Sequence, residues 1–106
     1  MAQHQKFNSF AEMIAGSKTP ILVDFYASWC GPCRLMATVL EEVKSGIGDE
    51  VSIVKVDTEK YPAIASDWQI SALPTLILFK GGQPIDRIEG VLRPADLLQR
   101  LRQAVA

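Results

Sequence analysis

The chain has 106 residues, of which 48% are hydrophobic and 22% are charged, with eleven basic against twelve acidic side chains. This length and composition predict one globular domain, residues 1–106, large enough to build a core without stabilising disulfides or metals. The net charge of −1 and the absence of Lys/Arg clusters argue against nucleic acid or a membrane surface as a partner. No apolar stretch has the length of a signal peptide or of a membrane span. We therefore expect a soluble, monomeric, cytoplasmic protein, unless a transit segment has been removed.

The first expected elements in chain order are a short helix, a strand and a long helix. Ser9 and Glu12 match a capping box, which predicts a helix that runs to about Gly16. The near-continuous apolar run over 21–27 is typical of a strand covered on both faces. Apolar residues at the spacing i, i+3, i+4 and i+7 then predict an amphipathic helix that ends near Gly46; they are Met36, Val39, Leu40 and Val43.

The second half of the chain predicts three more strands and two more helices. A strand over 51–57 would complete a right-handed parallel crossover unit with the first strand and the long helix. A short helix over 62–68 and a strand over 75–80 follow, and Gly81-Gly82 predicts a hairpin into an antiparallel strand over 84–90. A final helix begins at Pro94. The expected fold class is α/β, a three-layer sandwich in which a mixed sheet has helices on both faces.

Both cysteines lie where the first strand meets the long helix, in the motif Trp29-Cys30-Gly31-Pro32-Cys33. Gly31 permits a tight turn, and Pro32 is tolerated in the first turn of a helix, where its missing amide is no loss. Side chains at this spacing lie about 5–6 Å apart, within the reach of a disulfide. The positive end of the helix should lower the pKa of Cys30 below its free value of about 8.5. We therefore expect Cys30 to attack and Cys33, more buried, to resolve.

Two alternatives use the same cysteines without redox chemistry. A CxxC pair can form half of a zinc site, but such a site needs further ligands, and His4 is the only histidine of the chain. A structural pair of buried cysteines would not need Gly31-Pro32 at a strand-to-helix junction. In a reducing compartment, two cysteines are more often catalytic or metal-binding than a permanent disulfide. CxxC beside a strand–helix–strand unit is typical of a thioredoxin-like redox motif.

The chain resembles the thioredoxin family over essentially its whole length. "VDFYAS" precedes "WCGPC", and "ALPT", "LFKGG" and "IEG" follow it in the order seen in the family. Within the family, "KVDTEKYP", "ALPTLILFKGG" and "DRIEG" resemble the y-type thioredoxins of plastids and cyanobacteria. The resemblance implies a protein-disulfide reductase that works by dithiol–disulfide exchange. Its redox-active group would be the Cys30–Cys33 disulfide, with no bound cofactor and no metal.

The resemblance also assigns roles to two charged residues near the cysteines. Asp24 lies within the apolar strand, so desolvation should raise its pKa. The matching family aspartate lies beneath the cysteines and relays a proton, which implies a catalytic Asp24; a carboxyl group satisfied by backbone or water is the alternative. Lys55 matches a lysine that pairs electrostatically near that aspartate. A lysine whose side chain simply extends from the strand into solvent is the alternative there.

A flat apolar groove that binds target proteins is a further implication of the resemblance. Pro74 would follow a cis bond and face the disulfide, although only about 5–6% of X–Pro bonds in folded proteins are cis. The backbone beside Pro74 would pair with an extended target segment. Trp29 would lie over the site, although a large aromatic side chain can also fill core volume, and Trp68 is expected in the core. The other expected groove residues are Gly31, Pro32, Ile70, Ala72, Leu73, Gly90 and Val91.

Two residues depart from the family pattern. Thr38 stands where many members carry a proline that bends the helix, and Tyr26 stands where a second tryptophan is common. Neither position touches the reacting atoms, so the expected function is unchanged.

The expected partners are disulfide-containing proteins, such as peroxiredoxins, and a thioredoxin reductase. That reductase would depend on ferredoxin in the y-type context and on NADPH otherwise, and the compartment would be the cytoplasm or the plastid stroma. Two other functions stay open. The same fold could act as a disulfide oxidase or isomerase, although Gly-Pro between the cysteines resembles the reductant side. It could also serve as a non-catalytic binding subunit.

Overall fold

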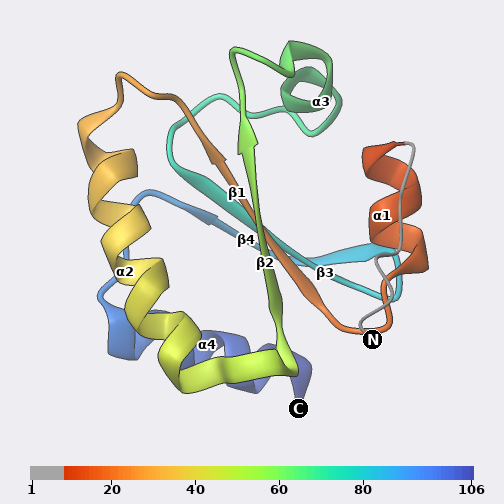
Figure 1. Cartoon of the computed structure of the whole chain (residues 1–106), viewed down its shortest axis with the longest axis vertical. Helices are drawn as coiled ribbons and strands as arrows, with labels where there is room; N and C mark the ends of the chain where they lie inside the picture. Colours follow the sequence, from red (N-terminus) through yellow and green to blue (C-terminus); the bar gives the residue numbers. More distant parts are fainter. Residues whose placement is uncertain (1–8) are drawn as a thin grey trace, which may run out of the picture.

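A four-stranded mixed sheet lies between two layers of helices in the computed structural model, which describes residues 9–106 (Figure 1). The elements are α1 (Phe10–Gly16), β1 (Ile21–Tyr26), α2 (Gly31–Ile47), the 3₁₀ helix η1 (Gly48–Glu50), β2 (Ser52–Asp57), α3 (Pro62–Asp67), β3 (Thr75–Lys80), β4 (Gln83–Glu89) and α4 (Pro94–Val105). Each predicted helix and strand is present, with ends shifted by a residue or two. His4, the only histidine that could add to a zinc site, lies outside the described residues.

The strands follow the order β2-β1-β3-β4 across the sheet. β1 pairs in parallel with β2, while β3 is antiparallel to both β1 and β4, so the predicted crossover unit and hairpin are confirmed. Gly81 and Gly82 have φ values of 60° and 81°, the left-handed conformation that a tight hairpin turn requires. Because β1 and β2 run in the same direction, the residues that follow them meet at one end of the sheet, where β1 leads into α2 (Figure 1).

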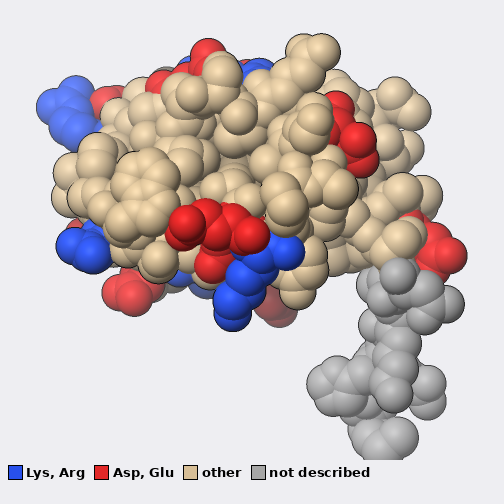
Figure 2. Space-filling view, turned by 90° about the horizontal axis from the view of Figure 1, so that it is seen from above, with Lys and Arg blue, Asp and Glu red and all other residues tan. Residues whose placement is uncertain are grey.

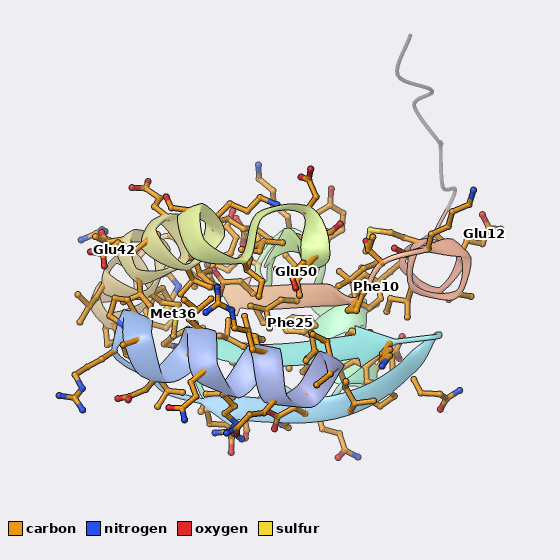
Figure 3. The ribbon with its side chains drawn as sticks, turned by 90° about the horizontal axis from the view of Figure 1, so that it is seen from below. Phe10, Glu12, Phe25, Met36, Glu42 and Glu50 are labelled. Atoms are coloured by element: carbon orange, nitrogen blue, oxygen red, sulfur yellow. A yellow bond between two sulfur atoms is a disulfide. The ribbon has the colours of Figure 1, made fainter. Side chains whose placement is uncertain are left out.

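Alternation along the strands divides the core between the two faces of the sheet. Leu22, Leu76 and Leu78 pack against α2 and α4, whereas Val23, Phe25 and Phe79 point to the face covered by α1 and α3 (Figure 1). Figure 3 shows Met36 and Phe25 directed into the interior, with Glu12 and Glu42 on the outside. No helix within residues 9–106 is both long and apolar enough to cross a membrane.

Local signals account for the ends of the helices. Oγ of Ser9 accepts the backbone N–H of Glu12 at 3.1 Å, the first half of the predicted capping box. Pro94 lies in the first turn of α4, as predicted. α2 continues through Thr38 as one helix from Gly31 to Ile47, in keeping with a residue that retains its amide at this position. Trp68 is half-buried and packs edge-on against Phe79, with ring centroids 5.0 Å apart.

Candidate active site

The two cysteines lie at the N-terminus of α2 and are joined as a disulfide, with their Cα atoms 5.2 Å apart. Cys30 is the N-cap residue, and its Sγ accepts the backbone N–H of Cys33 at 3.2 Å. The carbonyl of Ala27 accepts the N–H of Cys30 and so closes the turn out of β1. An N–H group and the positive end of a helix therefore point at the sulfur of Cys30. In the reduced protein this arrangement favours a thiolate at that sulfur.

The expectation that Cys33 is more buried than Cys30 is wrong for the disulfide form. Cys30 and Cys33 are each 5% exposed. The sequence places Cys30 at the helix mouth, but it does not show that both sulfurs pack with Ala27 and are covered by Tyr26 and Leu73. Leu73 lies forty residues after Cys33 in the chain, so only tertiary packing brings it to the cysteines.

Asp24 lies on the face of β1 that is covered by α2, directly beside Lys55 in the register of β1 and β2. It is 1% exposed, and its Oδ1 is the one buried side-chain nitrogen or oxygen atom within residues 9–106 that has no hydrogen-bond partner. Burial raises the pKa of Asp24 from 3.8 to about 6, and the positive charge of Lys55 opposes part of this shift. The direction expected for Asp24 is therefore found, and Lys55 interacts with it through space.

A cavity of about 160 Å³ lies between the buried carboxyl group of Asp24 and Cys33. Asp24 and Cys33 both line it, together with Tyr26, Ala27, Ser28, Arg34, Ala37 and Lys55. The sequence did not single out Arg34, whose guanidinium donates to the carbonyl of Ser28 at 3.2 Å. Its position directly after Cys33 was the feature of the sequence from which it could have been found. Tyr26 was noted only as a departure from the family pattern, and here it forms part of the wall.

Removing the charge of Lys55 tests its effect on the buried carboxyl group. Lys55→Met should raise the pKa of Asp24 above its value of about 6, because the lysine charge favours the ionised form. The measurement is a carboxyl-carbon NMR titration of the oxidised protein. Lys80→Met, which removes an exposed lysine at the end of β3, is the control and should leave the titration unchanged. A fall, or no change, in the pKa of Asp24 in Lys55→Met would contradict this account.

The loop before β3 lies beside the disulfide. The Leu73–Pro74 peptide bond is cis, as the resemblance implied, and Leu73 packs against the two cysteines. The hydroxyl of Thr75 donates to the carbonyl of Ala72 at 2.6 Å. The N–H of Gly90 donates to the carbonyl of Pro74 at 2.9 Å, which joins the loop to the end of β4. These bonds fix the loop that places Leu73 against the cysteines.

The other expected groove residues lie at or near this end of the sheet. Trp29 is 67% exposed, so it does not fill core volume. Gly31 and Pro32 are exposed at the start of α2, and Ala72 is exposed in the loop. Three residues are half-buried instead: Gly90, Ile70, which packs against the core under α1 and α3, and Val91, which packs against the core under α2 and α4.

Uncharged side chains make up most of this end of the molecule. Figure 2 views it from above Figure 1, onto the end that carries the β1–α2 connection and α3, and acidic and basic side chains are interspersed among the uncharged ones. Within residues 9–106, no group of three or more His, Cys, Asp or Glu side chains is placed to hold a metal ion. A disulfide at a helix N-terminus, beside a buried carboxyl group and a largely uncharged surface, defines a thiol–disulfide exchange protein.

Comparisons with known proteins identify the family. The chain matches the thioredoxin family model over residues 1–103. It is 57% identical to a thioredoxin-like protein of Synechocystis sp., covering 96% of this chain and 97% of that protein. It is 50% identical to the chloroplastic thioredoxin Y of Oryza sativa, covering 98% of this chain but 62% of the rice protein. This chain therefore spans less than two thirds of the length of that plastid relative.

A solved structure agrees with these matches. The crystal structure of a chloroplastic thioredoxin z superposes with a TM-score of 0.79 at 36% identity, covering 87% of this chain and 83% of that one. The chain belongs to the thioredoxin family, whose members are protein-disulfide reductases that work by dithiol–disulfide exchange. The Cys30–Cys33 disulfide is its redox-active couple.

Proposed function

We propose that Cys30 is the nucleophile and Cys33 the resolving cysteine when this protein reduces disulfides in target proteins. The observation that carries this assignment is the hydrogen bond from the N–H of Cys33 to Sγ of Cys30 at the N-cap of α2. The helix N-terminus stabilises negative charge on Cys30, so Cys30 ionises more readily than a free thiol. Cys33 lies within the helix and adjoins the cavity that contains Asp24.

The reaction transfers two electrons from the dithiol to the target. The Cys30 thiolate attacks one sulfur of the target disulfide, which forms a mixed disulfide and releases the other target sulfur as a thiolate that takes up a proton. Cys33 then loses its proton and attacks Sγ of Cys30. The Cys30–Cys33 disulfide forms, the bond between Cys30 and the target breaks, and the target's second sulfur leaves as a thiolate.

Asp24 accepts the proton that Cys33 must lose in the second step. Its pKa of about 6 makes it mostly ionised at pH 7, yet still basic enough to take up a proton for a short time. The cavity of about 160 Å³ between the two groups is large enough for a water molecule to carry the proton. Lys55 tunes the carboxyl group from the neighbouring strand.

Target proteins bind across the surface beside the disulfide. This groove consists of Trp29, Gly31, Pro32, Ile70, Ala72, Leu73, Pro74, Gly90 and Val91. An extended target segment would pair with the backbone beside Pro74, and exposed Trp29 would supply an apolar contact on the other side of the disulfide.

The proposed physiological setting draws support from the relatives. Residues 1–106 act as a single monomeric domain in cytoplasm or plastid stroma and carry electrons to proteins such as peroxiredoxins. A ferredoxin-dependent reductase, or else one that uses NADPH, restores the dithiol. The similarity to a cyanobacterial protein and to a chloroplastic thioredoxin Y favours the ferredoxin route.

Trapping of the mixed disulfide tests the assignment of the cysteines. In Cys33→Ser the first attack still occurs but the second cannot, so target proteins from a reduced cell extract should remain attached through Cys30. Non-reducing electrophoresis would show adducts that a reductant releases. Cys30→Ser is the matched control and should form none. Adducts of equal yield in both variants, or in neither, would contradict the assigned order of attack.

A further inference from the structure

Arg87 joins β4 to the C-terminal end of α3. Its guanidinium donates two hydrogen bonds, from Nη1 to the carbonyl of Trp68 at 2.8 Å and from Nη2 to the carbonyl of Gln69 at 2.7 Å. Both carbonyls follow directly after α3, where the last carbonyl groups of a helix lack partners within it and a positive charge is favourable. Hydrogen bonds from a charged donor are stronger than neutral ones.

The chain changes direction at the point that Arg87 holds. Gln69 has a φ of 53°, the only non-glycine residue within 9–106 with a positive φ, and the N–H of Ile70 returns to the carbonyl of Ala65 at 2.9 Å. The next four residues, 70–73, lead to Pro74 and include three of the proposed groove residues. Arg87 therefore fixes the N-terminal end of this loop. The Gly90–Pro74 and Thr75–Ala72 bonds fix its other end.

Arg87 is itself held from the opposite face of the sheet. Oδ1 of Asp86 accepts the backbone N–H of Arg87 at 2.8 Å. The same carboxylate binds the guanidinium of Arg100 on α4 at 2.7 Å and 2.8 Å, which lowers the pKa of Asp86. Because neighbouring residues of a strand point to opposite faces, Asp86 and Arg87 connect β4 with α4 on one side and with the end of α3 on the other.

We propose that Arg87 is a positioning residue for target recognition: it holds the loop 70–73 in the shape that the groove needs. The inference rests on the proposed role of that groove. Arg87 does not line the cavity of Asp24 and Cys33, so its loss should leave the sulfur chemistry unchanged. It should weaken the binding of large targets, which contact the loop, and spare small disulfides, which need only the cysteines.

Kinetics with two substrates separate these effects. Arg87→Met keeps the aliphatic part of the side chain and removes the donors. With dithiothreitol as reductant and insulin as the protein disulfide, we expect KM to rise about fivefold with kcat unchanged. This pattern indicates the loss of a binding interaction that contributes equally to the ground state and the transition state. The rate with the small disulfide of Ellman's reagent should stay within experimental error of the parent, and Arg87→Lys should recover part of the lost affinity.

The matched control is Arg102→Met. Arg102 also donates from an exposed arginine to a backbone carbonyl, that of Gly46 at 3.1 Å, but it joins α4 to α2 instead of holding the loop. Its KM for insulin should equal that of the parent. A second, function-independent readout is amide hydrogen exchange, which should speed up at residues 70–73 in Arg87→Met and not in Arg102→Met.

The outcomes distinguish a failure of the positioning role of Arg87 from a failure of the proposed function. An unchanged KM in Arg87→Met, an equal loss with the small disulfide, or an equal rise of KM in Arg102→Met would overturn the positioning role. If Arg87→Met does not fold, Arg87→Gln is judged by the same three criteria. A parent protein that reduces neither substrate would instead overturn the proposed function, and the groove argument for Arg87 with it.

Discussion

Asp24→Asn is expected to stabilise the oxidised protein at pH 7 by up to about 3 kcal/mol, because each unit of pKa shift corresponds to about 1.36 kcal/mol. The pKa of Asp24 is 3.8 in a free chain and about 6 in the fold. Between pH 3.8 and about pH 6, the carboxyl group of Asp24 holds its proton in the folded protein but loses it in the unfolded chain. The contribution of Asp24 to stability therefore falls as pH rises from about 4 to about 6. Above that range the cost of burying the carboxylate is complete. An uncharged amide avoids this cost, although burial of its N–H groups offsets part of the gain.

Urea unfolding of the oxidised protein at several pH values measures the effect. The gain in free energy of unfolding should be largest at pH 7 and should shrink towards pH 4, where the parent carboxyl group is protonated in the fold. Asp49→Asn is the control, since Asp49 is exposed in η1 and is not desolvated when the chain folds. A variant no more stable than the parent at pH 7 would show that Asp24 carries no desolvation cost.

The same substitution is expected to slow the resolving step by about 100-fold, at the lower end of what a positioned proton acceptor contributes. Attack by Cys30 on the target should slow much less, because that thiolate is stabilised by the N-terminus of α2. The difference should grow as pH rises through about 6, since below that pH the carboxyl group of the parent is itself protonated and cannot accept a proton. Asp24 would thus reduce stability and increase turnover.

Single-turnover kinetics distinguish the two steps. The mixed disulfide between Cys30 and a target peptide should accumulate in Asp24→Asn and decay slowly, whereas in the parent and in Asp49→Asn it should decay as soon as it forms. If both steps slow by the same factor, Asp24 does not relay the proton from Cys33. If neither slows, another group accepts it.

The elements could be predicted because their signals are local. The apolar run of β1, the helical spacing of apolar residues in α2 and the glycines at 81 and 82 each act within a few residues. The same is true of the thiol pair, since Cys30 at the strand end and Pro32 in the first turn place both sulfurs at a helix N-terminus. Asp24 could be predicted as a perturbed carboxyl group because it interrupts an otherwise apolar strand.

Local signals failed where distant segments meet. Cys33 was expected to be more buried than Cys30, but Leu73 and Tyr26 cover the pair and leave them equally buried. In the sequence, Arg87 looks like an ordinary polar residue on an alternating strand. Its role emerges only because the hairpin places it beside the end of α3, eighteen and nineteen residues earlier in the chain.

The sequence by itself determined the order of the elements and the chemistry of the redox couple, because backbone preferences, side-chain periodicity and a CxxC spacing are properties of short segments. The tertiary structure alone decided which groups surround that couple. The cavity shared by Asp24 and Cys33, the bond between Gly90 and Pro74 and the two bonds of Arg87 each join segments from different elements. Such contacts depend on how sheet and helices pack, and packing is set by the whole set of buried side chains at once.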